Sequence, residues 1–304
     1  MTPRRRTVVI GSVAAAVTVT GLVLVARSPY IAALLEPGKP SPVAGQAVPT
    51  IVPEPEVRVA VVGDTGTGDS AQQATAEQIL AERGDHPYDA LLLLGDLIYE
   101  EGDAELTHER VIEPYLPLTS AGTRLLPVLG NHDYLSGEQQ QILDALGRTD
   151  SWYVDELGPL RVVVLDSNRV DDPDQTRWLR AVLSEPQPPQ AWTIVAMHHP
   201  PYSAGQHGSD LAVQEAWVPL FTKFDVSLAF AGHDHDYQRS RPLDGVTYIV
   251  SGAGAKLRDT GTEDFTTVSS STLHFVDLLV YDDRLICRAI DESGVLVDAF
   301  TIDR

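Results

Sequence analysis

The stretch ALLLLGDLIY, residues 90–99, places Gly95 and Asp96 directly after an uninterrupted apolar run, with Tyr99 three residues further on. An apolar run of this length with a glycine just beyond it predicts a buried strand that hands polar side chains to one rim of a sheet. In open α/β sheets, ligands bind outside the carboxyl ends of the strands. We therefore expect Asp96 to lie at a ligand-binding edge of a sheet.

Four other stretches share this design, each an apolar run followed at once by polar residues that can bind a metal. They are VRVAVV before Gly63-Asp64-Thr65-Gly66, LLPVL before Gly130-Asn131-His132-Asp133, WTIVAM before His198-His199, and VSLAFA before Gly232-His233-Asp234-His235. Carboxylate, amide and imidazole groups that converge at one edge suit a pair of hard-to-borderline metal ions. The five blocks together predict a dinuclear metal site.

Strand and helix patterns alternate from residue 57 onward. Helical patterns cover residues 70–83, 137–146, 174–183 and 211–224, and strand patterns cover residues 90–94, 125–129, 160–166, 192–197 and 226–231. From residue 246 the tail reads almost entirely as strand. Alternating units predict a largely parallel sheet, and the all-strand tail predicts a second sheet that closes over it.

In this order the five blocks resemble the calcineurin-like metallophosphoesterase superfamily, and within it the purple acid phosphatase branch with its short tartrate-resistant form. The resemblance spans about residues 57–238. It implies an α/β fold, a four-layer α/β/β/α sandwich of two mixed sheets flanked by helices. It also implies a dinuclear metal centre at one edge of this sandwich.

The resemblance implies seven metal ligands, which are Asp64, Asp96, Tyr99, Asn131, His198, His233 and His235. Asp64, Tyr99 and His235 would serve the first metal, and Asn131, His198 and His233 the second. Asp96 would bridge both, because one carboxylate can hold two ions about 3.5–4 Å apart. Tyr99 stands where this branch has a tyrosinate bound to ferric iron, which implies Fe paired with Fe, Zn or Mn. An ordinary packing tyrosine is the alternative, and Leu97 departs from the asparagine common in this branch.

Three further residues receive catalytic roles from the resemblance. His132 is expected beside the phosphate, with Asp133 orienting its ring. His207 stands nine residues after His198 and matches a substrate-pocket histidine of the branch, although a solvent histidine in a glycine-rich loop is the alternative. His199 either packs behind His198 or touches substrate. His86, His108 and His274 belong to no motif and are predicted as surface or packing residues.

The resemblance implies a metal-dependent phosphoric ester hydrolase of the acid phosphatase type, in which a metal-activated hydroxide attacks a small phosphorylated substrate. We expect phosphate monoesters as substrates, and a phosphodiesterase or nucleotidase is the alternative. A second hypothesis is an envelope domain that keeps the metal site and has lost catalysis. The sequence contains no GxSxG elbow, Walker A loop or CxxC pair, which removes the obvious rival chemistries.

The formal net charge is −21, and no cluster of Lys and Arg follows the N-terminal segment, so we expect no nucleic-acid-binding surface. Arg4-Arg5-Arg6 precede an uncharged, largely apolar run over residues 7–26, which is long enough to cross a bilayer. Residues 1–35 are therefore predicted as a signal peptide or an uncleaved transmembrane anchor. Either would place the catalytic domain outside the cytoplasm, and an anchor would make the membrane a partner.

The chain between this segment and the first strand is rich in proline. We predict residues 36–56 as an extended linker and residues 57–304 as the metallophosphoesterase domain. The single cysteine, Cys287, cannot form an internal disulfide, and its apolar neighbours predict a buried position in a strand.

Overall fold

The computed structural model describes residues 38–304, so the predicted signal peptide or anchor lies outside the described residues. Within residues 38–304, no helix combines the length and the apolar character that crossing a bilayer requires. Residues 38–304 form one compact unit.

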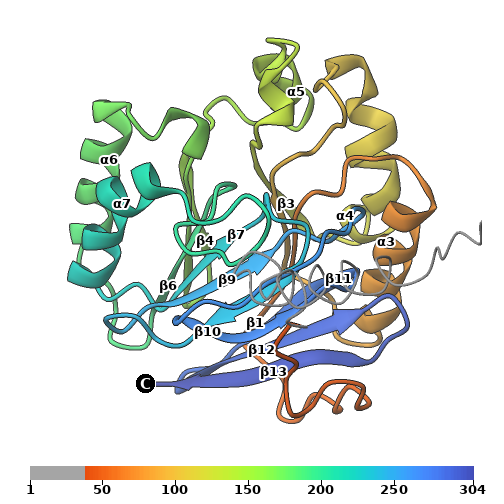
Figure 1. Ribbon diagram of the computed structural model, residues 1–304, viewed down its shortest axis with the longest axis vertical. Helices are drawn as coiled ribbons and strands as arrows, with labels where there is room; N and C mark the ends of the chain where they lie inside the picture. The colour runs from red at the N-terminus through yellow and green to blue at the C-terminus, as the bar shows by residue number, and fades with distance from the viewer. Residues whose placement is uncertain (1–37) are drawn as a thin grey trace, which may run out of the picture. The chain divides into compact units, whose positions relative to one another are not determined.

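Two mixed sheets form the centre of this unit (Figure 1). The first sheet has the strand order β13-β12-β11-β1-β2-β3, with β1 (Val57–Val62), β2 (Ala90–Leu94), β3 (Arg124–Val128), β11 (His274–Val280), β12 (Arg284–Asp291) and β13 (Leu296–Asp303). The second sheet has the order β10-β8-β9-β7-β6-β5-β4, with β4 (Tyr153–Leu157), β5 (Leu160–Val164), β6 (Trp192–Ala196), β7 (Leu228–Ala231), β8 (Tyr237–Ser240), β9 (Thr247–Ser251) and β10 (Thr266–Ser270).

Helices cover the outer face of each sheet. They are α3 (Ser70–Arg83), α4 (Leu116–Thr119), α5 (Gln139–Ala145), α6 (Pro173–Ser184) and α7 (Leu211–Lys223), with short turns of 3₁₀ and π helix between residues 104 and 115. In Figure 1, α6 and α7 lie on one side of the molecule and α3 and α4 on the other. This arrangement is the predicted four-layer sandwich.

The alternation of side chains between the two faces of a strand explains why a central strand such as β2 is apolar at every position. Val59 and Val61 of β1 pack into the core between the sheets, together with Leu92 of β2 and Ile194 of β6. The intervening Ala60 packs instead on the side that holds α3 and α4. Because both faces of these strands are covered, apolar residues are favoured on both faces.

The placement of the tail corrects the sequence prediction. β11 pairs antiparallel with β1, with Val59 opposite Leu278, and β12 and β13 continue the same sheet. The tail is therefore divided between the sheets, because β9 and β10 belong to the second sheet and β11, β12 and β13 extend the first. β1 has β2 on only one side, and β11 satisfies the N–H and C=O groups of its other edge. Cys287 of β12 is buried, as predicted.

The proline-rich segment also differs from its prediction, because residues 38–56 dock on the domain. Leu296 N donates to Gln46 O at 2.8 Å, and Ser269 N donates to Lys39 O at 2.8 Å. Two proline carbonyls accept side-chain hydrogen bonds, Pro49 O from Arg288 at 2.7 Å and Pro53 O from Tyr281 at 2.9 Å. Proline lacks an N–H but keeps its acceptor, so a high proline content does not prevent docking. The folded unit begins at Gly38.

Candidate metal centre

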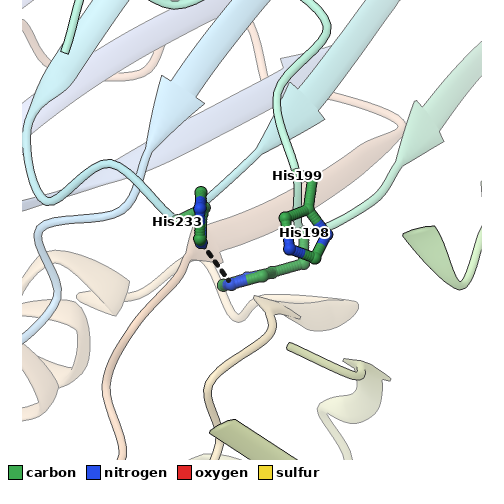
Figure 2. A group of neighbouring side chains, drawn as sticks. All are labelled: His198, His199 and His233. Atoms are coloured by element: carbon green, nitrogen blue, oxygen red, sulfur yellow. Dashed lines mark hydrogen bonds between the residues drawn. The ribbon is translucent and has the colours of Figure 1, made fainter. Parts of the chain in front are cut away.

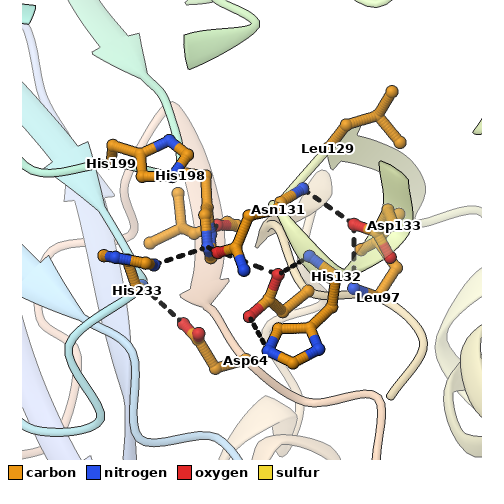
Figure 3. Close-up of polar contacts among 12 residues, drawn as sticks. Asp64, Leu97, Leu129, Asn131, His132, Asp133, His198, His199 and His233 are labelled. Carbon is orange, nitrogen blue, oxygen red and sulfur yellow. Dashed lines mark hydrogen bonds and ion pairs between the residues drawn. The ribbon is translucent and has the colours of Figure 1, made fainter. Parts of the chain in front are cut away.

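The predicted ligands gather where parallel strands of both sheets end. Asp64, Asp96 and Asn131 follow β1, β2 and β3, which run parallel to one another. His198 and His233 follow β6 and β7, which are also parallel. Figure 3 shows Asp64, Asn131, His198 and His233 converging from these two directions. The site thus lies at the junction of the two sheets.

The first group of ligand atoms surrounds the Tyr99 hydroxyl. Asp64, Asp96 and His235 are all buried, and each offers one ligand atom within 4.8 Å of the others. The Tyr99 oxygen lies 3.1 Å from Asp64 Oδ1, 2.9 Å from Asp96 Oδ2 and 3.1 Å from His235 Nε2. Tyr99 is therefore positioned as a member of this group and not as a distant packing residue.

The second group is centred on the imidazole of His198. Its Nε2 lies 3.0 Å from Asn131 Oδ1, 3.2 Å from His233 Nδ1 and 3.3 Å from Asp96 Oδ1. Figure 2 shows this contact between the His198 and His233 rings, with His199 beside them. Asn131 Oδ1 and Asp96 Oδ1 can only accept hydrogen bonds. His198 Nε2 carries a lone pair, because the proton of the neutral His198 ring is on Nδ1, which donates to Leu94 O. Three of the four atoms therefore carry a lone pair and no hydrogen.

Asp96 connects the two groups through its two carboxylate oxygens. Oδ2 faces Tyr99 at 2.9 Å, and Oδ1 faces His198 Nε2 at 3.3 Å. A carboxylate held in this way can bind one ion with each oxygen. Asp96 therefore has one carboxylate oxygen in each group.

The backbone of the site is held in unusual conformations. Asp64, Asp96 and His233 have positive φ angles of 59°, 51° and 71°, a region that costs free energy for residues other than glycine. A Cβ atom at Gly130 would overlap Asp96 Oδ1, and one at Gly232 would overlap Asp64 Oδ2. These two glycines leave the space that the carboxylates occupy, which explains their place in the motifs.

Burial sets the charge state of the imidazoles. It lowers the pKa of His198 well below its ordinary value and that of His233 to about 2. Burial, followed by Arg258, lowers the pKa of His235 to about 4. Neutral imidazole is the form that binds metals.

The carboxylates show the complementary effect. Burial and the neighbouring Asp96 raise the pKa of Asp64 well above its ordinary value. A cation between these groups would offset the repulsion between the two carboxylates and would occupy the lone pairs of the imidazoles. The donor set, with carboxylate, phenol, amide and neutral imidazole, fits two metal ions.

His132 reaches the site from the loop after β3. Its Nε2 lies 3.9 Å from Asp96 Oδ2, and its side chain is 25% exposed. Its Nδ1 lies 2.5 Å from the carbonyl oxygen of Glu100. A carbonyl can only accept, so this contact fixes the Nδ1 proton and directs Nε2 toward the site.

Asp133 has a different role from the predicted one of orienting the His132 ring. The 3₁₀ turn at His132–Tyr134 directs its buried carboxylate inward. There it accepts backbone hydrogen bonds from Gly130 at 2.7 Å, Ile98 at 3.0 Å and Leu97 at 3.1 Å. Asp133 thus joins the loop after β2 to the loop after β3, as Figure 3 shows.

The other histidines separate into site residues and packing residues. The His207 ring lies 4.2 Å from the His233 ring, so His207 is at the site. His199 Nδ1 lies 2.8 Å from Ser167 Oγ, and the His199 ring lies 4.6 Å from that of His233. His274 is fully buried and contacts Ser251 Oγ at 3.0 Å, consistent with a packing role.

Sequence reasoning missed two cations at the mouth of the site, Lys256 and Arg258. Lys256 Nζ lies 3.6 Å from the centroid of the Tyr99 ring, and Arg258 donates to His207 Nε2. Both follow β9 in the stretch TYIVSGAGAKLR, which repeats the pattern of an apolar run followed by glycine. The same signal that identified the other five blocks was therefore present here.

The sequence matches a known protein family and several phosphatases. Residues 57–237 match the family described as Calcineurin-like phosphoesterase. Purple acid phosphatase 17 of Arabidopsis thaliana is 25% identical over 232 residues, which cover 64% of this chain and 68% of that protein. Tartrate-resistant acid phosphatase type 5 of Mus musculus is 26% identical over 244 residues, which cover 66% of this chain and 73% of that protein.

Another relative matches a shorter region. An uncharacterized protein of Mycobacterium tuberculosis is 33% identical over 111 residues, which cover 31% of this chain and 21% of that protein. The match to this relative thus spans about a fifth of its length.

Solved structures show the same fold. A purple acid phosphatase from yellow lupin seeds has a TM-score of 0.70 at 20% identity, covering 83% of this chain and 55% of that one. A dimetal phosphatase from Danio rerio has a TM-score of 0.58 at 18% identity, covering 82% and 99%. The predicted fold and family resemblance are confirmed. The chain belongs to the calcineurin-like phosphoesterase family.

Proposed function

We propose that this chain hydrolyses phosphate monoesters at a dinuclear metal centre and acts outside the cytoplasm. The observation that carries the proposal is the position of Asp96, whose Oδ2 faces Tyr99 at 2.9 Å and whose Oδ1 faces His198 at 3.3 Å. One carboxylate shared by two donor groups is the arrangement that a two-metal hydrolase needs.

The two donor groups define which residues would hold each ion. Asp64, Tyr99 and His235 would hold one ion, Asn131, His198 and His233 the other, and Asp96 would hold both. We propose Fe paired with Fe, Zn or Mn, with Tyr99 on the ferric ion. When bound, such ions polarise the phosphate oxygens and lower the pKa of a water molecule toward neutrality.

His132 and His207 are the residues that we assign to the leaving group. His132 keeps its Nδ1 proton on the Glu100 carbonyl, so its Nε2 is the atom that exchanges a proton at the mouth of the site. Arg258 donates to His207 Nε2, which leaves the proton of the neutral His207 ring on Nδ1. A histidine that donates a proton to the departing alcohol raises the rate of ester hydrolysis.

The preference for monoesters rests on the relatives, which are named as acid phosphatases. The test is turnover of p-nitrophenyl phosphate and bis-p-nitrophenyl phosphate by the purified protein supplied with Fe, Zn or Mn. We expect higher kcat/KM for the monoester. Higher kcat/KM for the diester would contradict the monoester assignment in favour of the diesterase, and bound metal without turnover of either ester would favour an inactive binding domain.

The proposed location rests on the N-terminal sequence. Arg4-Arg5-Arg6 before the apolar residues 7–26 resemble an export signal or an anchor, and Arg5-Arg6 resemble a twin-arginine signal. Cell fractionation with an antibody against the domain should find it in the envelope or the medium. A full-length chain in the cytoplasmic fraction alone would contradict export.

A further inference from the structure

The loop of residues 252–265, between β9 and β10, is attached to the segments that carry the metal ligands. Three backbone hydrogen bonds hold it, from Gly254 N to Gly63 O at 3.0 Å, from Arg258 N to His235 O at 2.9 Å, and from Gly261 N to Ala204 O at 3.1 Å. These acceptors lie beside Asp64, on His235 itself and in the loop of His207. The loop therefore has a fixed position relative to the site.

Lys256 extends from this loop over Tyr99. Its Nζ lies 3.6 Å from the centroid of the Tyr99 ring and 2.8 Å from Glu100 Oε1. The Lys256 side chain is 29% exposed and that of Glu100 is 69% exposed. Exposed ion pairs of this kind contribute little to stability, so an anionic ligand can replace Glu100 as the partner of Lys256.

Arg258 extends from the same loop toward the other donor group. It donates to His207 Nε2, and the His207 ring lies 4.2 Å from that of His233. Arg258 also donates its backbone N–H to the carbonyl oxygen of His235 at 2.9 Å, and Lys256 lies over Tyr99, whose hydroxyl is 3.1 Å from His235 Nε2. The two cations thus lie near the two groups of metal ligands, with His235 close to both.

These cations stand out against the charge of the whole chain. The formal net charge is −21, with 22 Lys and Arg against 43 Asp and Glu, so the chain as a whole repels polyanions. In the proposed function, the metals, His132 and His207 would already serve the scissile phosphate and its leaving group. An ammonium and a guanidinium at the mouth are suited to a further phosphate, which they bind by charge-assisted hydrogen bonds.

We infer that Lys256 and Arg258 form a second anion subsite, which selects substrates carrying another phosphate on the leaving side of the scissile bond. This inference rests on the proposed function. In the reaction, water oxygen bonds to the scissile phosphorus and the bridging P–O bond breaks. The leaving phosphate keeps the electron pair and takes up a proton, while the subsite holds its charge.

The test compares metal-loaded wild-type protein with Lys256→Met and Arg258→Gln. Methionine keeps apolar contact with the Tyr99 ring, and glutamine keeps a donor for His207. Each substitution should lower kcat/KM for pyrophosphate about tenfold more than it lowers kcat/KM for phenyl phosphate, as expected for a lost charge-assisted hydrogen bond.

Matched controls are available elsewhere on the surface. Lys223 ends α7, and its Nζ lies 5.0 Å from the centroid of the Phe224 ring. The side chain of Arg177 on α6 is 73% exposed and pairs with Asp174. Lys223→Met and Arg177→Gln remove the same charges and should leave the ratio of the two kcat/KM values unchanged. An equal change in the controls would overturn the subsite, because net charge alone would then explain the effect.

Binding of unreactive ligands gives a second measurement. Wild-type protein should bind methylenediphosphonate about tenfold more tightly than methylphosphonate in calorimetry, and the two variants should lose this difference.

Equal losses of kcat/KM for pyrophosphate and phenyl phosphate in the two variants would overturn the subsite by placing both cations on the scissile phosphate. An equal loss for phosphoserine would overturn the assignment to phosphate, since a carboxylate would suffice. If wild type hydrolyses no ester, the proposed function fails, while diphosphonate binding still decides the subsite.

Discussion

His198 donates its Nδ1 proton to the carbonyl oxygen of Leu94, 2.8 Å away. Leu94 ends β2 in the first sheet, whereas His198 follows β6 in the second. This hydrogen bond fixes the tautomer of His198 and presents the lone pair of Nε2 to Asn131 and Asp96. Backbone carbonyls commonly orient metal-binding histidines in this way.

Asp96→Asn should remove most activity and weaken both metal sites, because one carboxylate is shared between them. We expect kcat/KM to fall at least about a hundredfold. The fold should persist, since asparagine tolerates the positive φ of 51° at this position. Metal content by mass spectrometry and turnover of p-nitrophenyl phosphate measure the effect, with the exposed Asp150→Asn as control. Near-normal metal content and rate would show that Asp96 is not the bridging ligand.

Tyr99→Phe should remove the colour of an iron-loaded sample. A phenolate bound to ferric iron gives a visible charge-transfer band, and phenylalanine keeps the ring that packs 4.5 Å from His132. Hydrolysis should fall only partly, because Asp64, Asp96 and His235 still hold the first metal. A visible spectrum tests this, with Tyr153→Phe as a control that keeps the colour. A colourless wild type, or an unchanged spectrum in Tyr99→Phe, would identify Tyr99 as a packing residue.

A chain that starts at Gly38 should be markedly more stable than one that starts at Val57. The segment between them makes several hydrogen bonds to the domain, including Leu296 N to Gln46 O and Tyr281 to Pro53 O. At about 1 kcal/mol each, their loss should lower the free energy of unfolding by a few kcal/mol. Urea denaturation of both metal-free chains measures the difference. Equal midpoints would mean that the docked segment adds no stability.

His274 should make stability depend on acid pH. Burial lowers its pKa to about 4 in the folded chain, against an ordinary value of 6.5. Between these values the unfolded state binds the proton and the folded state does not. The stabilisation is complete above pH 6.5 and decreases as the pH falls toward 4, by roughly 2–3 kcal/mol.

The measurement is denaturant unfolding of metal-free protein at pH 7.5 and pH 4.5. His274→Gln should reduce the loss of stability between the two pH values, whereas the more exposed His86→Gln should not. A loss of the same size in wild type and His274→Gln would assign the acid sensitivity to other groups.

The sequence predicted those elements and site residues whose defining neighbours lie close to them in the chain. The helix predicted at residues 70–83 coincides with α3, because Asp69 caps its first turn and Gly84 follows its last residue. The five ligand blocks were recognised because each lies within a few residues of its own apolar run.

The features that the sequence did not predict depend on distant partners. β8 and β10 have the polar sequences YQRS and TTVSS, and they form strands because β8 pairs with β9 on one side and with β10 on the other. The partner of β11 is β1, far away in the chain, so the tail could not be assigned to a sheet from its own residues. The inward direction of Asp133 likewise depends on N–H groups of Leu97 and Ile98 in another loop.

The division of the donors between two sheets has a consequence for cohesion. The first sheet supplies Asp64, Asp96 and Asn131, and the second supplies His198, His233 and His235. An ion held jointly by Asp96 and His198 would link the two sheets, which otherwise adhere through apolar side chains. Ion affinity and the adhesion between the sheets are thermodynamically linked. Separation of the sheets would therefore release the ions, and bound ions would oppose that separation.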